Sequence, residues 1–188
     1  TRDMLGGAIP GGILLTAQNV ASPQQVRDLV AALQKIARES GAAVPLFVAV
    51  EQEGGRVQRL RFSPFTQLPP PFSWGEREDP AFVESLAYVA SREMAEVGCN
   101  MNLAPLLDLS GRADGSVIGD RSLGWKPDVV GSLGSAFVRG SARAGVPAVV
   151  KHFPGHGVTT QDTRAALPSV EMDDFLWQRH LRPFRIAV

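Results

Sequence analysis

The chain has 188 residues, of which 44% are hydrophobic, and its 19 basic and 19 acidic side chains give a formal net charge of zero. This balance excludes a strongly basic nucleic-acid binder and an intrinsically disordered segment. No apolar run reaches the roughly 20 residues that a membrane-spanning helix needs. The single cysteine, Cys99, excludes an intramolecular disulfide and favours a reducing compartment. We therefore expect a soluble, cytoplasmic globular protein in which Cys99 is a small buried side chain.

The first predicted unit is an apolar strand over residues 11–16 followed by a helix. Ser22, Pro23 and Gln25 have the spacing of a capping box with proline at the first helical position. Apolar residues then recur with the 3.6-residue period of a helix, and Gly41 ends it.

The second unit begins with an almost wholly apolar strand over residues 45–50, as expected for a strand that is covered on both faces. Charged residues crowd a Gly-Gly turn in 51–59, and a proline-rich loop follows over 64–71. Asp79 then caps a helix that Gly98 ends.

The third unit has a strand over residues 100–105, a long loop, and a helix over 127–145. A fourth apolar strand covers 148–150. The last segment, 173–188, has helical spacing, but Pro183 must kink this helix or start a new turn.

Four strands that alternate with helices predict an α/β fold with a parallel sheet. The polar residues of interest all follow strands. This arrangement is typical of a (β/α)8 barrel, whose active site lies at the C-terminal ends of the strands. A doubly wound sheet follows a similar rule, so the pattern alone leaves both folds open.

The fourth strand runs into residues 151–157 (Lys-His-Phe-Pro-Gly-His-Gly), and residues 162–164 (Asp-Thr-Arg) follow after four intervening residues. The Pro-Gly pair excludes a helix, so this segment is predicted to be a mobile loop that can close over a ligand. His152 and His156 are four residues apart, which would suit metal ligands on a helix. The Pro-Gly break and the lack of a third ligand argue against a metal site.

This pattern resembles the signature of glycoside hydrolase family 3, in its β-N-acetylglucosaminidase (β-N-acetylhexosaminidase) branch. That signature is Lys-His-Phe-Pro-Gly-His-Gly, four variable residues, Asp, Ser or Thr, and His; only Arg164 departs from it. The resemblance implies that residues 1–188 form a single N-terminal barrel domain, from the family's second strand to the helix after its fifth. A complete TIM barrel takes about 250 residues. We therefore expect an incomplete portion, truncated at both ends, with the nucleophilic aspartate beyond Val188.

The resemblance further implies a retaining hydrolase that cleaves β-linked N-acetylglucosamine, with substrates of the cell-wall muropeptide type and no cofactor or metal. Five residues match the family's sugar-binding positions, and we expect them to converge on one rim of the sheet: Glu51, Arg59, Arg121, Lys151 and His152. Glu51 stands where the family usually has a shorter aspartate, so its contact must be re-aimed or lost.

The resemblance assigns the catalytic positions to the second half of the signature. In the family, the aspartate at the position of Asp162 orients the histidine that acts as general acid/base. Arg164 replaces that histidine here, and a guanidinium cannot donate and recover a proton near neutral pH. His156 is the nearest possible substitute. As an alternative, Asp162 and Arg164 simply form an exposed ion pair.

Three functions remain open at this point. The protein is an active hydrolase, a catalytically inactive sugar-binding or regulatory homologue, or a phosphorylase in which Arg164 helps to hold phosphate. We expect carbohydrate as the ligand, and no nucleic acid, membrane or protein partner.

Several candidate residues also have a purely structural interpretation. An isolated Glu or Arg in a loop is usually a solvated surface charge. Lys151 and His152 directly follow an apolar strand, where unpaired charge is unfavourable, so ion pairing or function must explain them. We expect Asp108 to cap a loop, and Trp74 and Trp125 to serve ordinary packing rather than sugar stacking.

Overall fold

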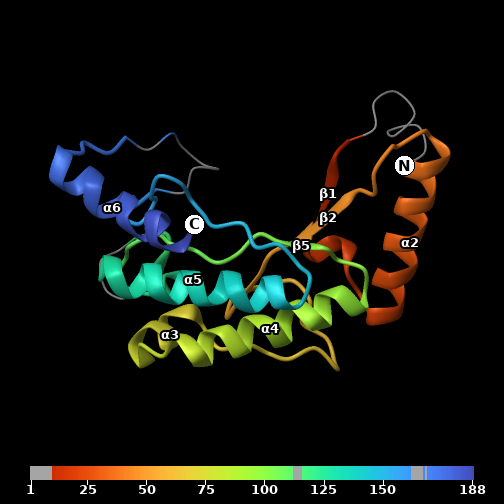
Figure 1. Ribbon diagram of the computed structural model, residues 1–188, viewed down its shortest axis with the longest axis horizontal. Coiled ribbons are helices and arrows are strands. Elements are labelled where there is room, and N and C mark those ends of the chain that lie inside the picture. Colours follow the sequence, from red (N-terminus) through yellow and green to blue (C-terminus); the bar gives the residue numbers. More distant parts are fainter. Residues whose placement is uncertain (1–9, 112–115, 162–166, 168) are drawn as a thin grey trace.

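The structure is a computed structural model that describes residues 10–111, 116–161, 167 and 169–188. Its main sheet is parallel and has the strand order β1-β2-β5, formed by β1 (Gly12–Leu15), β2 (Phe47–Val50) and β5 (Met101–Asn102). Leu15 pairs with Val50, which in turn pairs with Asn102. The α/β class and the parallel strands agree with the sequence prediction (Figure 1).

The predicted fourth strand is present as two parallel bridges rather than as a continuous strand. Ala148 pairs with Asn102, and Lys151 pairs with Leu106. The N–H of Lys151 donates to the carbonyl of Pro105 at 3.1 Å, and the carbonyl of Lys151 accepts from the N–H of Leu107 at 2.6 Å. The segment still lies parallel and adjacent to β5, so it delivers Lys151 to the sheet edge where β2 also ends.

A long helix follows each of the three strands: α2 (Pro23–Glu39), α4 (Pro80–Glu96) and α5 (Pro127–Arg143). Each begins at a proline, whose missing N–H is not needed in the first turn. Ser22 Oγ accepts a hydrogen bond from Gln25 N at 3.1 Å, and Asp79 Oδ1 accepts one from Phe82 N at 3.0 Å. The Gln25 side chain accepts from Ala21 N, one residue earlier than the capping-box pattern predicts.

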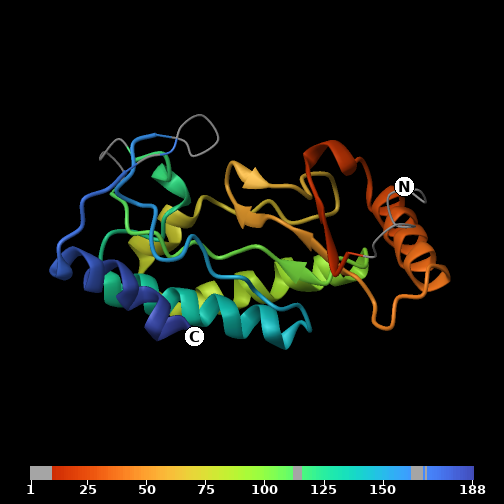
Figure 2. The same cartoon turned by 90° about the horizontal axis from the view of Figure 1, so that it is seen from above.

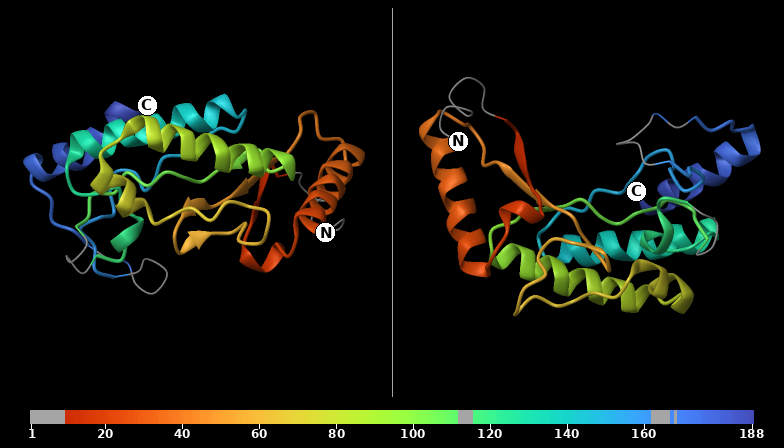
Figure 3. Two further views of the ribbon diagram at one scale, coloured as in Figure 1. Left: turned by 90° about the horizontal axis from the view of Figure 1, so that it is seen from below. Right: turned by 180° about the vertical axis from the view of Figure 1, so that it is seen from behind.

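The C-terminal segment is one helix, α6 (Asp174–Ala187), which continues through Pro183. Asp173 caps it by accepting a hydrogen bond from Leu176 N at 2.7 Å. α5 lies between α4 and α6 (Figures 1 and 3). No helix in the described ranges is long and apolar enough to cross a membrane.

Several short elements were not predicted. β3 (Gln52–Gly54) and β4 (Val57–Gln58) form an antiparallel hairpin, α3 (Pro71–Arg77) follows the proline-rich loop, and 3₁₀ turns form η1 (Ala17–Asn19) and η2 (Gly119–Arg121). Gly54 and Gly55 have φ angles of +104° and +55° and make the hairpin turn. The hairpin strands carry polar residues and are too short to show an apolar alternation.

Two groups of buried side chains hold the molecule together. One joins α4, α5 and α6 and contains Trp74, whose ring stacks on Phe137 with centroids 6.3 Å apart. The other packs α2 against β1 and β2 and contains Cys99. Burial raises the pKa of the Cys99 thiol to about 12, so this side chain is an inert small hydrophobe, as expected.

The layers place the loops that follow the strands on one side of the molecule. Figure 2 shows the β3–β4 hairpin and η2 on that side, with α4, α5 and α6 along the other. Within the described residues the strands form an open sheet and do not close into a barrel.

Candidate functional site

A network of charges surrounds Lys151 at the C-terminal edge of the sheet. Lys151 Nζ lies 2.9 Å from Glu51 Oε1 and 2.7 Å from Glu53 Oε1. The second oxygen of Glu51 pairs with Arg59. Arg121 binds both oxygens of Glu53 through Nε and Nη2, each at 2.9 Å. The structure thus brings together four of the five residues that the sequence selected for this rim.

Glu53 is the member of this network that the sequence analysis missed. Its side chain is only 1% exposed, and it joins Lys151 to Arg121. Glu51 and Glu53 are two residues apart around the start of β3, and residues with this spacing share a face of an extended strand. This period-two spacing is the signal that could have identified Glu53 beside Glu51.

The charges of this network support one another. Burial alone would raise the pKa of Glu51, but hydrogen bonds and charges from Arg59 and Lys151 outweigh burial and lower it to about 2. Burial acts against the charged form of Arg121, but its hydrogen bonds and charge interaction with Glu53 leave its pKa raised. Glu51 and Arg121 are therefore both charged at neutral pH.

Asp108 organises the loop that carries the two histidines. It is fully buried, and its carboxylate accepts hydrogen bonds from the backbone N–H of His152 at 3.2 Å and of His156 at 2.5 Å. This is the loop-capping role that the sequence analysis favoured. Asp108 Oδ2 also lies 2.7 Å from His152 Nδ1, so Nδ1 carries a proton and Nε2 faces away from the carboxylate.

His152 directly follows Lys151, but its ring bonds to Asp108 and not to the carboxylates of the charge network. The His152 ring is 38% exposed and contacts His156 edge to face, with ring centroids 5.8 Å apart. An orienting carboxylate behind an accessible imidazole is an arrangement that suits hydrogen bonding to a ligand or proton transfer.

His156 is held by its own loop. Thr159 Oγ1 donates to the carbonyl oxygen of His156 at 2.9 Å, and the same hydroxyl lies 2.7 Å from His156 Nδ1. Because the hydroxyl proton is engaged with the carbonyl, we assign the Nδ1–H tautomer, which leaves the lone pair on Nε2. In this tautomer Nε2 can accept a proton.

Two of the predicted catalytic positions, Asp162 and Arg164, lie outside the described residues. Among the residues that the structure does describe, no group of three His, Cys, Asp or Glu side chains is placed to hold a metal ion. The described residues offer hydrogen bonding, charge stabilisation and proton transfer by imidazole.

Comparison with known proteins assigns the chain. The sequence pattern of the glycosyl hydrolase family 3 N-terminal domain matches residues 1–188. The chain belongs to glycosyl hydrolase family 3.

Solved family 3 structures superpose closely on the chain. A β-N-acetylglucosaminidase from Paenibacillus sp. str. FPU-7 is 41% identical with a TM-score of 0.93, covering 99% of this chain and 35% of that one. NagZ from Neisseria gonorrhoeae, in complex with N-trifluoroacetyl-D-glucosamine, is 33% identical with a TM-score of 0.86, covering 97% of this chain and 54% of that one. These matches identify the open sheet as an incomplete portion of a (β/α)8 barrel rather than a doubly wound sheet.

The family 3 chain spans about half or less of its curated relatives. A β-hexosaminidase from Nitrosomonas eutropha is 38% identical over 192 residues, which are 98% of this chain and 53% of the relative. β-Hexosaminidase A from Pseudoalteromonas piscicida is 38% identical over 178 residues, which are 93% of this chain and 30% of the relative.

The two tryptophans named in the sequence analysis have different environments in this family 3 domain. Trp74 is buried and stacked, as expected for packing. Trp125 is 57% exposed and is therefore not part of the core, while its use in packing or in sugar stacking stays a prediction. The sequence could not show this, because the exposure of Trp125 depends on the cavity that α3 and the start of α5 leave beside it.

Proposed function

We propose that the protein to which this chain belongs is a glycoside hydrolase that cleaves β-linked N-acetylglucosamine, with cell-wall muropeptides as its substrate type. The observation that carries this proposal is the network of Glu51, Glu53, Lys151, Arg59 and Arg121 at the barrel rim of a family 3 domain. The names of the relatives, β-hexosaminidase and β-N-acetylglucosaminidase, support the substrate class.

The network suits a ligand rich in hydroxyl groups. Sugar hydroxyls both donate and accept hydrogen bonds, and Lys151 and the arginines offer charged donors beside carboxylate acceptors. Glu53 forms ion pairs with both Lys151 and Arg121, so these donors are held in position before the sugar binds. This reduces the conformational entropy that the side chains lose on binding.

The proposed reaction retains the configuration of the sugar. Retaining glycosidases use a carboxylate nucleophile and a separate proton donor around an oxocarbenium-like transition state. We assign the sugar-binding half of this machinery to the present chain, with Glu51, Arg59, Arg121, Lys151 and His152 as the binding residues.

The proton donor is the unusual part of the proposal. Arg164 occupies the position that the family signature gives to a histidine, two residues after Asp162 in the sequence, and it cannot serve as an acid near neutral pH. His156 is the substitute that the loop offers, since its Nδ1 is engaged with Thr159 and its Nε2 is left for proton exchange. The reaction then proceeds slowly with poor leaving groups unless His156 takes over this role.

The test is turnover of aryl N-acetyl-β-glucosaminides and muropeptide fragments by the full-length protein, with the anomeric configuration of the first product followed by NMR. We expect the β-anomer first. Lys151→Met should weaken sugar binding by about ten- to a hundredfold because a charged hydrogen-bond donor is lost. Lys35→Met, at an exposed Lys35–Glu39 pair remote from the rim in sequence, is the control and should match the wild type.

Three results would replace this proposal. An α-anomer as first product would contradict retention. Phosphate-dependent release of a sugar phosphate would identify a phosphorylase. Sugar binding that depends on Lys151, without turnover of any substrate, would identify a catalytically inactive sugar-binding homologue. The specific argument for this alternative is that Arg164 stands where the family signature has a histidine.

A further inference from the structure

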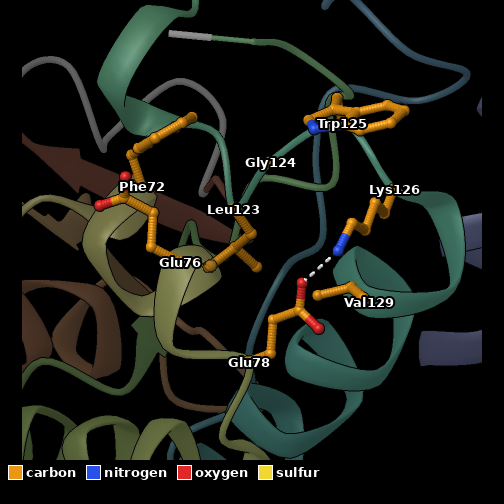
Figure 4. Close-up of a pocket in the computed structure, with 9 residues that line it drawn as sticks. Phe72, Glu76, Glu78, Leu123, Gly124, Trp125, Lys126 and Val129 are labelled. Carbon is orange, nitrogen blue, oxygen red and sulfur yellow. Dashed lines mark hydrogen bonds and ion pairs between the residues drawn. The ribbon is translucent and has the colours of Figure 1, made fainter.

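A cavity lies between α3 and the start of α5. It has a volume of about 250 Å³. Figure 4 shows Phe72 and Glu76 of α3 on one side and Trp125 and Lys126 on the other, with Glu78 at the base. Its walls come from elements that this chain itself supplies.

Trp125 is held in place although its ring is exposed. Arg179 of α6 donates to the carbonyl oxygen of Trp125 at 2.8 Å, and its guanidinium lies 5.9 Å from the centre of the indole ring. The preceding residue, Gly124, is fixed as well, because its carbonyl accepts from Ser110 N at 3.0 Å. An exposed aromatic ring on a braced backbone offers a large contact area with little motion to lose on binding.

Polar groups complete the cavity. Lys126 Nζ lies 2.6 Å from Glu78 Oε1 at the base of the cavity. Glu76 adds an exposed carboxylate on the opposite wall. Two carboxylates beside one ammonium disfavour an anionic ligand such as a phosphate, because like charges repel. An aromatic face combined with carboxylate and ammonium groups matches a neutral pyranose ring, which has apolar C–H faces and hydroxyl edges.

The cavity and the candidate site share one loop. Arg121 binds Glu53 in the charge network, and Trp125 follows four residues later. Between them, Ser122 Oγ donates to the carbonyl oxygen of Asp108 at 2.6 Å, which ties this loop to the residue that organises the two histidines. The loop that carries Arg121 of the charge network therefore also carries Trp125, an exposed aromatic surface compatible with carbohydrate.

We propose that this cavity is a second sugar-binding site, with Trp125 as its stacking platform, that takes a further sugar unit of the glycan whose terminal residue binds at Lys151. This inference deepens the proposed function and rests on it. It predicts that oligosaccharides of N-acetylglucosamine bind more tightly as they lengthen, up to the length that reaches Trp125.

The kinetic test compares chitooligosaccharides of two to six units with an aryl N-acetylglucosaminide in the full-length protein. Trp125→Ala should raise KM for the longest oligosaccharide about three- to tenfold, with kcat and the aryl substrate unchanged, because only the stacking contact is lost. Trp125→Phe keeps a smaller aromatic ring, so it should raise KM for the longest oligosaccharide less than Trp125→Ala does. Trp177→Ala is the matched control, since Trp177 is a partly exposed tryptophan of α6 that does not line this cavity.

The outcomes separate the second site from the proposed function. Unchanged KM for every chain length in Trp125→Ala overturns the second site while the hydrolase stands. If no substrate is turned over, the indole N–H signal of Trp125 is followed by NMR during titration with chitohexaose. A shift that Lys126→Met and Glu76→Gln weaken supports the site without hydrolysis, and no shift overturns it. A shift produced by free stem peptide but not by chitohexaose also overturns it.

Discussion

Lys151 Nζ lies 2.7 Å from Glu53 Oε1, and this carboxylate, which is 1% exposed, is simultaneously bound by Arg121. Two cations of the rim therefore depend on one buried anion. Buried charges are tolerated when they are paired and hydrogen-bonded, and removing one partner leaves the others uncompensated. This dependence makes Glu53 the first residue to test.

Glu53→Gln should destabilise the protein by about 3–5 kcal/mol, the usual effect of removing one partner from a buried ion pair. It should also weaken sugar binding, because Lys151 and Arg121 lose their common support. Urea unfolding and KM measure the two effects. Glu39→Gln removes the partner of Lys35 in an exposed pair and should change stability by less than about 1 kcal/mol. Equal stability of the two variants would show that Glu53 does not support the network.

Glu51 should make stability depend on pH in the acid range. Its pKa is about 2 in the folded protein against an ordinary value of 4.5, so the unfolded chain binds a proton first as the pH falls. The stability from Glu51 is complete above about pH 4.5 and is lost as the pH falls towards 2. Unfolding free energies between pH 5 and 3 should therefore fall less steeply in Glu51→Gln. Glu96→Gln, at the exposed Arg92–Glu96 pair, should keep the slope of the wild type.

His180 should add a second pH dependence nearer neutrality. It is buried on α6, and its Nδ1 has no hydrogen-bond partner among the described residues. Burial lowers its pKa; the charge of Asp108 opposes this effect, and that of Arg179 adds to it. The neutral imidazole therefore fits the fold, and stability is lost as the pH falls from the ordinary value of 6.5 towards the lowered one.

The check for His180 is the difference in unfolding free energy between pH 7 and pH 5. His180→Phe should show a smaller difference than the wild type, whatever its absolute stability, because the ionisable group is gone. An identical difference in both proteins would assign the pH dependence to other groups.

His180 also packs closely against the signature loop: a Cβ added at Gly155 would lie 2.8 Å from His180 Nδ1.

The sequence predicted what depends on local pattern. The capping residues Ser22 and Asp79 begin helices where expected, because a cap needs only neighbouring residues. Strand ends placed Glu51 and Lys151 at one edge, because parallel strands share their C-terminal side. The position of Arg59 beside Glu51 came from the family resemblance, since the β3–β4 hairpin that brings them together was not predicted.

What the sequence did not predict depends on tertiary contacts. Glu53 is a polar residue in a charged segment, and only the approach of Arg121 across a long loop shows why it is buried. No local sequence signal predicts that His180 is buried, because its burial depends on the packing of α6 against Gly155. Trp125 was assigned to packing because composition cannot tell a braced, exposed ring from a core one.

The last prediction concerns Arg164, whose position in the family signature belongs to the acid/base histidine. General acid/base catalysis contributes about 10² to 10⁴ in rate. In the full-length protein, Arg164→His should therefore cleave substrates with poor leaving groups at least about a hundredfold faster than the wild type. Activated aryl glycosides should gain less, because their leaving groups depart without a proton.

His156→Ala separates the two sources of a proton. If the site lacks an efficient acid because Arg stands at position 164, His156→Ala changes the slow wild-type rate little. Arg164→His then restores turnover both in the wild type and in the His156→Ala variant. If His156 supplies the proton, the wild type is already fast, Arg164→His adds nothing and His156→Ala abolishes turnover. Thr159→Val is the accompanying control for the assigned tautomer. Removing the hydroxyl that engages Nδ1 should shift the pH profile of kcat/KM only in the second case, because only then does the His156 imidazole take part in the reaction.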